Sequence, residues 1–241
     1  MERLDTMSQD QSERAAPRIT VPVVISESAV VPVLRAASAD RFPAVAEVLL
    51  DAGVRVFEVT LTSSGALQAI AALAKQLPTG TCIGAGTVLN ADDATAAIEA
   101  GAQFLVAPTR SLAVTTVAIT HGVPSFPGAL TPTEVLTAWE DGASAVKIFP
   151  ASIGGPEYLR AIAAPLPGIP LMPTGGIGLA EVPDYIRAGA IAVGVGGPLL
   201  RDATYPDGDL TALSSRARAL IEGIAETLAT ARADTDNAPH R

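Results

Sequence analysis

One supersecondary pattern repeats along this chain from residue 29 almost to its end. A short run rich in β-branched residues is followed by small residues or glycine, and then by an Ala/Leu-rich stretch with helical spacing. Three helical stretches end in similar phrases, Asp51-Ala-Gly-Val54, Glu99-Ala-Gly-Ala102 and Arg187-Ala-Gly-Ala190. This alternation predicts parallel strands joined by helices. The predicted strands are residues 30–35, 54–62, 81–88, 103–108, 123–129, 143–150, 169–175 and 190–197, and the predicted helices include 40–52, 64–77, 91–100, 133–141, 156–165, 179–188 and 210–231.

Eight strand–helix units are the number that closes a barrel of parallel strands, so the pattern predicts an α/β fold, a single-domain (β/α)8 TIM barrel. The alternative is a doubly wound open sheet, which carries G-x-G-x-x-G after its first strand when it binds a dinucleotide. Here the first predicted strand ends in Leu34-Arg-Ala-Ala37, without glycine. We therefore assign residues 19–231 to the barrel, residues 1–18 to a disordered leader and residues 232–241 to a flexible tail.

Composition excludes several classes of function. The net charge of −9 disfavours nucleic acid as a partner, although a small anion needs only a local group of donors. No apolar run reaches the roughly 18 residues that span a membrane, and the polar start of the chain lacks a signal peptide, so we expect a cytoplasmic protein. One cysteine, Cys82, rules out an internal disulfide, and two histidines cannot form a His-rich metal site. We expect neither a cofactor nor a metal.

Lys147 lies inside an apolar predicted strand, residues 143–150, and is one of only two lysines among 16 basic residues. Arginine cannot lose its proton at neutral pH, whereas a desolvated lysine can, and only the neutral amine attacks a ketone. By alternation Lys147 shares a strand face with Ala145 and Phe149, opposite Val146 and Ile148. The pattern predicts an inward-pointing nucleophile at the carboxyl-terminal end of the sixth strand.

Glu58 likewise is an ionisable residue inside an apolar predicted strand, residues 54–62. Alternation groups it with Val56, Thr60 and Thr62 on the inner face. An inward carboxylate and an inward amine would supply a base and a nucleophile, and active sites of such barrels lie at the strand ends. A buried structural ion pair is the alternative interpretation.

Two glycine-rich turns complete the predicted site. The seventh strand ends in Pro173-Thr-Gly-Gly176 and the eighth in Gly194-Val-Gly-Gly197. Loops after these strands commonly hold phosphate in barrels, so Gly175, Gly176, Gly196 and Gly197 are predicted phosphate ligands through their backbone N–H groups. Each turn by itself could equally serve a tight strand-to-helix connection.

Two further polar residues end predicted strands. Arg35 could bind a carboxylate or phosphate with both guanidinium arms, or could instead form a salt bridge at the rim of the barrel. Thr87 could donate to a substrate carboxylate or carbonyl, or could be a turn residue resembling an N-cap. Both residues are therefore predicted to bind substrate.

In this order, these segments resemble the family of 2-keto-3-deoxy-6-phosphogluconate (KDPG) and 4-hydroxy-2-oxoglutarate (KHG) aldolases. The resemblance covers residues 30–200, and the combination of motifs is specific although no single motif is. The matching motifs are Val30-Val-Pro-Val-Leu-Arg35, Val56-Phe-Glu-Val-Thr60, Ile83-Gly-Ala-Gly-Thr-Val-Leu89, Pro127-Gly128 followed by Thr131-Pro-Thr-Glu134, Val146-Lys-Ile-Phe-Pro150, Pro173-Thr-Gly-Gly176 and Gly194-Val-Gly196.

The resemblance implies a class I aldolase in which Lys147 forms a Schiff base and Glu58 is the acid/base. It also implies that Thr87 and Thr174 hold the substrate together with the glycine turn, and that Pro108 lines the same pocket. Family members are cytoplasmic homotrimers without a metal, acting in sugar-acid catabolism. The chain departs from many relatives at two positions, because Thr62 stands where an arginine is common and Gly197 where a serine is common.

The expected substrate is KDPG, which is cleaved to pyruvate and glyceraldehyde 3-phosphate, with KHG as a further candidate. Three alternatives stay open at this point. The chain could cleave the galactonate epimer, it could be a phosphate-binding isomerase or synthase that uses Glu58 as a base without a Schiff base, or it could bind sugar phosphates without catalysis.

Overall fold

The structure is a computed structural model that describes residues 18–236. Short strands alternate with helices in nearly the expected order. The strands are β1 (Val30–Leu34), β2 (Val56–Thr60), β3 (Cys82–Gly86), β4 (Leu105–Val106), β5 (Ser125–Phe126), β6 (Gly128–Ala129), β7 (Val146–Ile148), β8 (Leu171–Pro173) and β9 (Val193–Val195). The helices are α1 (Val23–Ser28), α2 (Phe42–Asp51), α3 (Ala66–Gln76), α4 (Ala91–Glu99), α5 (Leu112–Thr120), α6 (Pro132–Glu140), α7 (Gly155–Ala163), α8 (Val182–Arg187), α9 (Gly197–Leu200) and α10 (Leu210–Asp236), with 3₁₀ turns η1 (Ala151–Ile153) and η2 (Leu179–Glu181).

All strand pairs are parallel, but the hydrogen-bonded ladders do not form the single closed eight-strand sheet that was expected. Six strands pair in the order β5-β4-β3-β2-β1-β9, and three in the order β6-β7-β8. The fifth predicted strand is divided at Pro127, which has no N–H to donate to a ladder. Within residues 18–236, β8 and β9 are connected only by an isolated bridge between Thr174 and Gly194 and by a hydrogen bond from the Ile191 N–H to the Leu171 carbonyl. The fold is therefore a curled, TIM-barrel-like parallel sheet.

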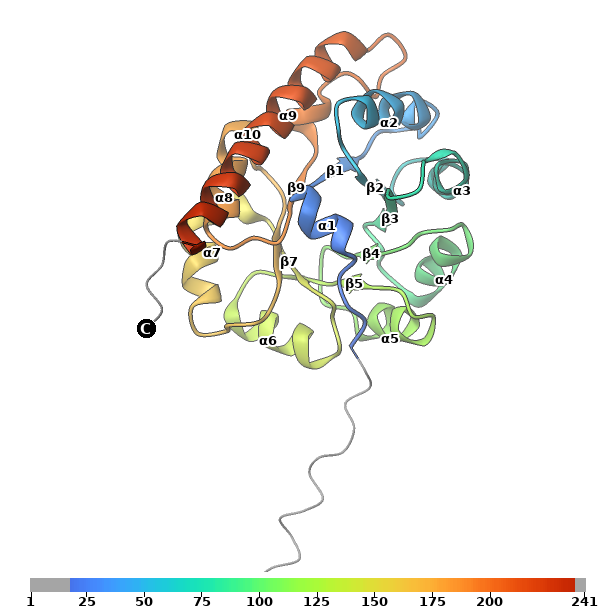
Figure 1. The fold of residues 1–241 in the computed structure, drawn as a ribbon. Helices are drawn as coiled ribbons and strands as arrows, with labels where there is room; N and C mark the ends of the chain where they lie inside the picture. The colour runs from blue at the N-terminus through green and yellow to red at the C-terminus, as the bar shows by residue number, and fades with distance from the viewer. Residues whose placement is uncertain (1–17, 237–241) are drawn as a thin grey trace, which may run out of the picture.

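Helices surround the strands on the outside, as Figure 1 shows in a view along the strands. The larger hydrophobic core lies between strands and helices, where the outward-facing Phe57, Val59, Val146 and Ile148 are buried. A smaller core fills the interior of the sheet and includes Val56 and Ala145. The alternation predicted for β2 and β7 is thus confirmed.

One end of the curled sheet is covered by α1. This helix lies across the strands in Figure 1, and its Ile25 belongs to the interior core together with Val31, Phe104 and Phe126. Because α1 precedes β1 in the chain, it lies at the amino-terminal ends of the strands, opposite the ends at which active sites of barrels form.

The helix ends follow the capping pattern of the sequence. The glycines that follow α2, α4, α5, α6 and α8 all have positive φ, as a left-handed cap requires: Gly53, Gly101, Gly122, Gly142 and Gly189. At the start of α6, the Thr131 side chain accepts from the Glu134 N–H, and Glu134 accepts in return from the Thr131 N–H. These caps satisfy backbone groups that the helices cannot pair internally.

Arg18, at the last position assigned to the leader, is in contact with α6. Its guanidinium lies 3.4 Å from the centre of the Trp139 ring and donates hydrogen bonds to the carbonyls of Trp139 and Ala143. The remainder of the predicted leader, residues 1–17, and the last five residues of the tail lie outside the described residues. α10 extends to Asp236, beyond the predicted end at 231. Within residues 18–236, no helix is long and apolar enough to cross a membrane.

Candidate active site

Lys147 and Glu58 meet inside the sheet at the carboxyl-terminal side of the interior core. Lys147 Nζ lies 4.0 Å from Glu58 Oε1, and the two side chains are 4% and 0% exposed. β7 and β2 belong to different ladders, so the curling of the fold brings the two groups together. Lys147 Nζ also lies 5.2 Å from the centre of the Phe149 ring. The structure therefore places an amine and a carboxylate side by side with little water around them.

Glu58 has room for its carboxylate because β3 carries glycine beside it. Glu58 pairs in register with Gly84, and a Cβ on the nearby Gly86 would lie 2.0 Å from Glu58 Oε1. Neither carboxylate oxygen of Glu58 has a hydrogen-bond partner within the described residues. A buried carboxylate without hydrogen bonds is costly, and such groups cluster at functional sites. Apart from Lys147, its hydrogen-bonding capacity is unused, so it can serve a ligand.

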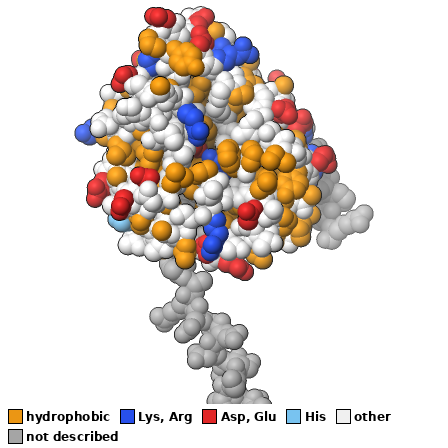
Figure 2. Space-filling view, turned by 180° about the vertical axis from the view of Figure 1, so that it is seen from behind, with side chains coloured by type: hydrophobic (Ala, Val, Ile, Leu, Met, Phe, Trp, Pro, Cys, Tyr) orange, Lys and Arg blue, Asp and Glu red, His pale blue; other side chains and the backbone are white. Residues whose placement is uncertain are grey.

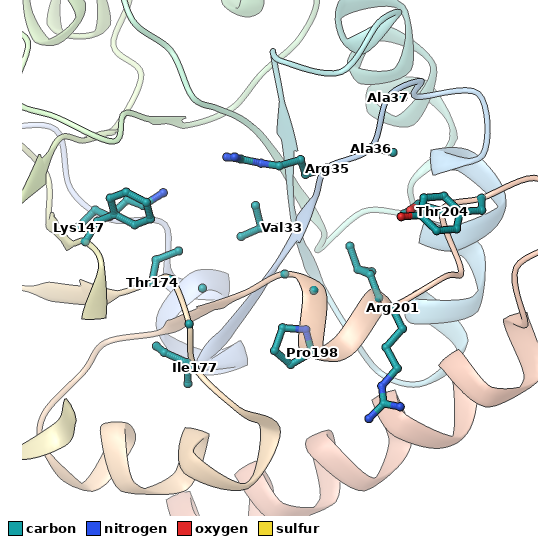
Figure 3. A pocket seen from close by; sticks show the side chains of 18 residues that line it. Val33, Arg35, Ala36, Ala37, Lys147, Thr174, Ile177, Pro198, Arg201 and Thr204 are labelled. Carbon is teal, nitrogen blue, oxygen red and sulfur yellow. The ribbon is translucent and has the colours of Figure 1, made fainter. Parts of the chain in front are cut away.

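A cavity of about 510 Å3 opens beside Lys147. Its size is typical of sites for small molecules. Eight of the predicted site residues line it: Arg35, Lys147, Phe149, Thr174, Gly175, Gly176, Gly196 and Gly197. In Figure 3 the Arg35 side chain extends toward the side of the cavity on which Lys147 lies.

The glycine turn after β8 faces the cavity with free backbone donors. Gly175 and Gly176 both have positive φ, and no hydrogen bond from either N–H is seen within the described residues. The Thr174 and Gly175 carbonyls accept from the Ala151 and Ser152 N–H groups, which hold the turn in place. The Thr174 side chain occupies the space beside Gly194, because a Cβ on residue 194 would lie 2.3 Å from Thr174 Oγ1.

The turn between β9 and α9 also faces the cavity with free backbone donors. Within the described residues neither the Gly196 N–H nor the Gly197 N–H makes a backbone hydrogen bond, and both residues line the cavity. The Leu199 and Leu200 N–H groups both donate to the Gly196 carbonyl, which holds this turn in place. The second glycine segment therefore offers two backbone donors to a ligand.

Arg35 is held at the rim of the cavity by Thr87. Its Nη2 donates to Thr87 Oγ1 at 2.9 Å. Thr87 has φ of 58°, a left-handed conformation that is costly for a β-branched residue. Such strained residues cluster at functional sites. The basic residues that line the cavity are Arg35, Lys147 and Arg201, although the Arg201 guanidinium points away from it in Figure 3, and Figure 2 shows basic side chains near the centre of this face. An anionic ligand therefore suits the cavity despite the negative net charge of the chain.

Three predicted site residues do not line this cavity. Glu58 lies behind Lys147, Thr87 contacts the cavity through Arg35, and Pro108 has its carbonyl packed against Gly128, where a Cβ would approach within 2.2 Å. Thr62, at the position where relatives often carry arginine, is exposed and donates to Thr60 Oγ1 at 3.2 Å.

Sequence reasoning missed the cavity wall formed by the segment after α9. Arg201, Thr204 and Tyr205 line the cavity although they follow the last predicted strand by several residues. The one available signal was Arg201, a basic residue soon after the Gly-Gly-Pro turn. Its positive φ of 46° is unusual for a residue with a side chain, and Figure 3 shows its guanidinium pointing away from the cavity.

Metal binding finds no support in the described part of the chain. No group of three His, Cys, Asp or Glu side chains there could hold a metal ion. The chemistry available to the cavity in residues 18–236 is therefore that of an amine, a carboxylate, guanidinium groups, hydroxyls and backbone N–H groups.

Comparison with known proteins gives a consistent result. The family model for KDPG and KHG aldolase matches residues 21–215. The KHG/KDPG aldolase of Escherichia coli (strain K12) is 34% identical over 201 residues, covering 83% of this chain and 94% of that protein. The 2-dehydro-3-deoxy-6-phosphogalactonate aldolase of the same strain is 36% identical over 170 residues, covering 70% and 83%. Among solved structures, the KDPG aldolase from Legionella pneumophila, with pyruvate captured as a covalent carbinolamine intermediate, superposes with a TM-score of 0.75 at 27% identity, covering 82% of this chain and 96% of that one.

Proposed function

This chain belongs to the KDPG and KHG aldolase family, and we propose that it cleaves a phosphorylated 2-keto-3-deoxy sugar acid through a Schiff base on Lys147. As an aldolase it is a lyase. The observation that carries the proposal is the buried Lys147–Glu58 pair, 4.0 Å apart, beside a cavity of about 510 Å3. Family membership disfavours the isomerase and non-catalytic alternatives.

The reaction begins on the amine of Lys147. In its neutral form Nζ adds to the C2 carbonyl of the substrate to give a carbinolamine, and loss of water gives an iminium. The capture of pyruvate as a carbinolamine in the relative from Legionella pneumophila supports this step. The position of Lys147 in the cavity wall also supports it, because the amine can meet the carbonyl of a bound substrate there.

Glu58 acts on the bound intermediate as base and then as acid. Its carboxylate takes the proton from the C4 hydroxyl, directly or through one water, while the C3–C4 bond breaks and its electrons move into the iminium. The aldehyde leaves and an enamine of pyruvate remains. The protonated Glu58 then returns the proton to C3, and hydrolysis frees pyruvate and Lys147. The absence of other hydrogen bonds to Glu58 within the described residues leaves both oxygens available.

Two groups of donors orient the substrate in this scheme. Arg35 and Thr87 bind the keto-acid carboxylate, with Arg35 taking the place of the arginine that many relatives carry at Thr62. The N–H groups of Gly175, Gly176, Gly196 and Gly197 bind the phosphate. Thr174, Phe149 and Pro108 complete the proposed substrate site.

KDPG is the proposed principal substrate, yielding pyruvate and glyceraldehyde 3-phosphate, with KHG, which yields pyruvate and glyoxylate, as a second. The galactonate epimer is a further candidate because a relative at 36% identity is a phosphogalactonate aldolase. Steady-state comparison of the two epimers and of KHG separates these candidates. Homotrimeric assembly and a cytoplasmic location stay predictions of the resemblance.

The test of the chemistry is borohydride reduction in the presence of pyruvate, followed by peptide mass mapping. We expect one reduced pyruvyl adduct, on Lys147, which Lys147→Arg abolishes. The other lysine of the chain gives a matched control, since Lys75 is exposed on α3 and Lys75→Arg should leave the adduct unchanged. Folded protein without an adduct at Lys147 would refute the Schiff-base proposal.

A further inference from the structure

The glycine turn after β8 packs tightly against the segment that follows β7. A Cβ on Gly175 would lie 2.8 Å from the nearest atom of the Phe149 ring. A Cβ on Gly176 would lie 2.4 Å from Ser152 Oγ. Contacts as close as these leave the turn no room to move toward that segment. The position of the turn, whose N–H groups we assign to the phosphate, therefore depends on where residues 149–152 lie.

Hydrogen bonds join the same two pieces of backbone. In η1, the Ala151 N–H donates to the Thr174 carbonyl at 2.8 Å. The next N–H along, that of Ser152, donates to the Gly175 carbonyl at 3.1 Å. Because two successive residues of η1 bond two successive residues of the turn, a displacement of η1 would displace the turn with it.

A buried tyrosine of α8 holds η1 from the helix layer. Tyr185 is 1% exposed within the larger core, and its hydroxyl donates to the Ala151 carbonyl at 3.1 Å. Burial, and to a lesser extent the charge of Glu181, raise the pKa of Tyr185, so the hydroxyl keeps its proton and stays a donor at neutral pH. The Gly154 N–H donates to the same carbonyl at the longer distance of 3.4 Å. The tyrosine hydroxyl is thus the closer of these two donors that fix η1.

We propose that Tyr185 is a positioning residue for phosphate recognition: its hydroxyl holds η1, and η1 holds the Gly175–Gly176 turn against the phosphate of the acceptor aldehyde. This inference rests on the proposed function. Tyr185 is not among the described residues that line the cavity, so it acts through the turn without touching the ligand. A phenylalanine would fill the same space in the core, so the hydroxyl contributes the directional bond alone.

The experiment is aldol addition of pyruvate to D-glyceraldehyde 3-phosphate and to D-glyceraldehyde, which differ only by the phosphate. The ratio of the two kcat/KM values measures what the phosphate contributes. Tyr185→Phe should lower this ratio about fivefold, which corresponds to about 1 kcal/mol. The loss should fall on the KM for the phosphorylated aldehyde, and the kcat/KM for D-glyceraldehyde should stay at the wild-type value.

Tyr158→Phe is the matched control. The Tyr158 hydroxyl, on α7, also donates to a carbonyl distant in the sequence, that of Leu130, at 2.9 Å. Removing either hydroxyl should lower the melting temperature by about 2–4 °C, but only Tyr185→Phe should change the ratio. If Tyr185→Phe does not fold, Tyr185→Met takes its place, because methionine fills irregular core space without a hydroxyl.

Three results would overturn the role of Tyr185. They are a ratio in the folded variant within twofold of the wild type, an equal loss with both aldehydes, and an equal fall of the ratio in Tyr158→Phe. Failure of the underlying aldolase function is a distinct outcome, because wild-type protein would then form no borohydride-trapped pyruvyl adduct on Lys147 and would add pyruvate to neither aldehyde.

Discussion

Replacing Gly86 with alanine perturbs Glu58 directly, because the three atoms nearest to the added Cβ all belong to Glu58. The added Cβ would lie 2.0 Å from Glu58 Oε1, 2.6 Å from its Cδ and 2.7 Å from its Cγ. Ordinary contact begins at 3.4 Å, so the carboxylate must retreat by about 1.4 Å. A misplacement of about 1 Å in a catalytic group costs about 100-fold in rate, which corresponds to roughly 2.7 kcal/mol of transition-state stabilisation.

Two half-reactions distinguish the expected effect of Gly86→Ala. Borohydride trapping of pyruvate reports on Lys147 and should persist. Exchange of the pyruvate C3 protons into D2O, followed by NMR, needs the proton transfer that we assign to Glu58 and should slow by about 100-fold. Overpacking should also lower the free energy of unfolding by about 1–3 kcal/mol, which denaturant melting measures.

The control for this variant is Gly223→Ala in α10, where an added Cβ meets no atom within 4 Å. It should leave trapping and exchange unchanged. Proton exchange within a few-fold of wild type in folded Gly86→Ala would refute the argument that Gly86 positions Glu58. Parallel loss of trapping and exchange would refute it too, since the effect would then lie in Lys147 or in the fold.

Four further predictions concern stability and reactivity. Burial raises the pKa of Cys82 to about 11, so an aromatic disulfide reagent at pH 8 should modify this thiol only in unfolded protein. The contribution of the buried neutral thiol to the free energy of unfolding is full below pH 9.0 and is lost as the pH rises toward 11. Arg18→Ala removes the stacking on Trp139 and two hydrogen bonds, and should destabilise the fold by about 1–3 kcal/mol and shift the emission of the one tryptophan; unchanged emission and melting would contradict the contact. Thr131→Ala removes the N-cap of α6 and should cost about 1 kcal/mol in urea melting. Backbone N–H groups of Thr131 and Leu130 lower the pKa of Glu134, so this carboxylate stabilises α6 fully above pH 4.5 and less as the pH falls; a Glu134→Gln variant with the wild-type acid profile would contradict this.

The order of strands and helices was predictable because two periodicities alternate along the chain. The inward orientation of Glu58 and Lys147 followed from alternation within β2 and β7 and is confirmed by the 4.0 Å approach of Lys147 Nζ to Glu58 Oε1. The bounds of α5 were not predicted, because Leu112–Thr120 is apolar and β-branched nearly throughout and shows no helical face. The division of the sheet was not predicted. Pro127 has no N–H, but whether its absence breaks a ladder depends on which neighbouring strand would have accepted a hydrogen bond at that position.

Part of the site could not be predicted because it depends on how segments far apart in the sequence pack together. Sequence patterns say which way a side chain points but not which residues of a later loop fold back over the strands. Thr204 and Tyr205 belong to such a loop, and they reach the cavity only through the turns that follow α9. The room that Gly86 leaves for Glu58 likewise depends on the register of β2 against β3.

The cover that α1 forms over the amino-terminal strand ends determines the route by which substrates and products enter and leave. Ile25 and the interior core close the route through the sheet, so reactants and products share the mouth on the opposite face. Lys147, 4% exposed, lies deep, whereas Tyr205 is 62% exposed. The aldehyde must then depart before pyruvate, and in the synthetic direction it must arrive second. An excess of aldehyde would occupy the passage ahead of pyruvate, so the synthetic reaction should slow at high aldehyde concentration.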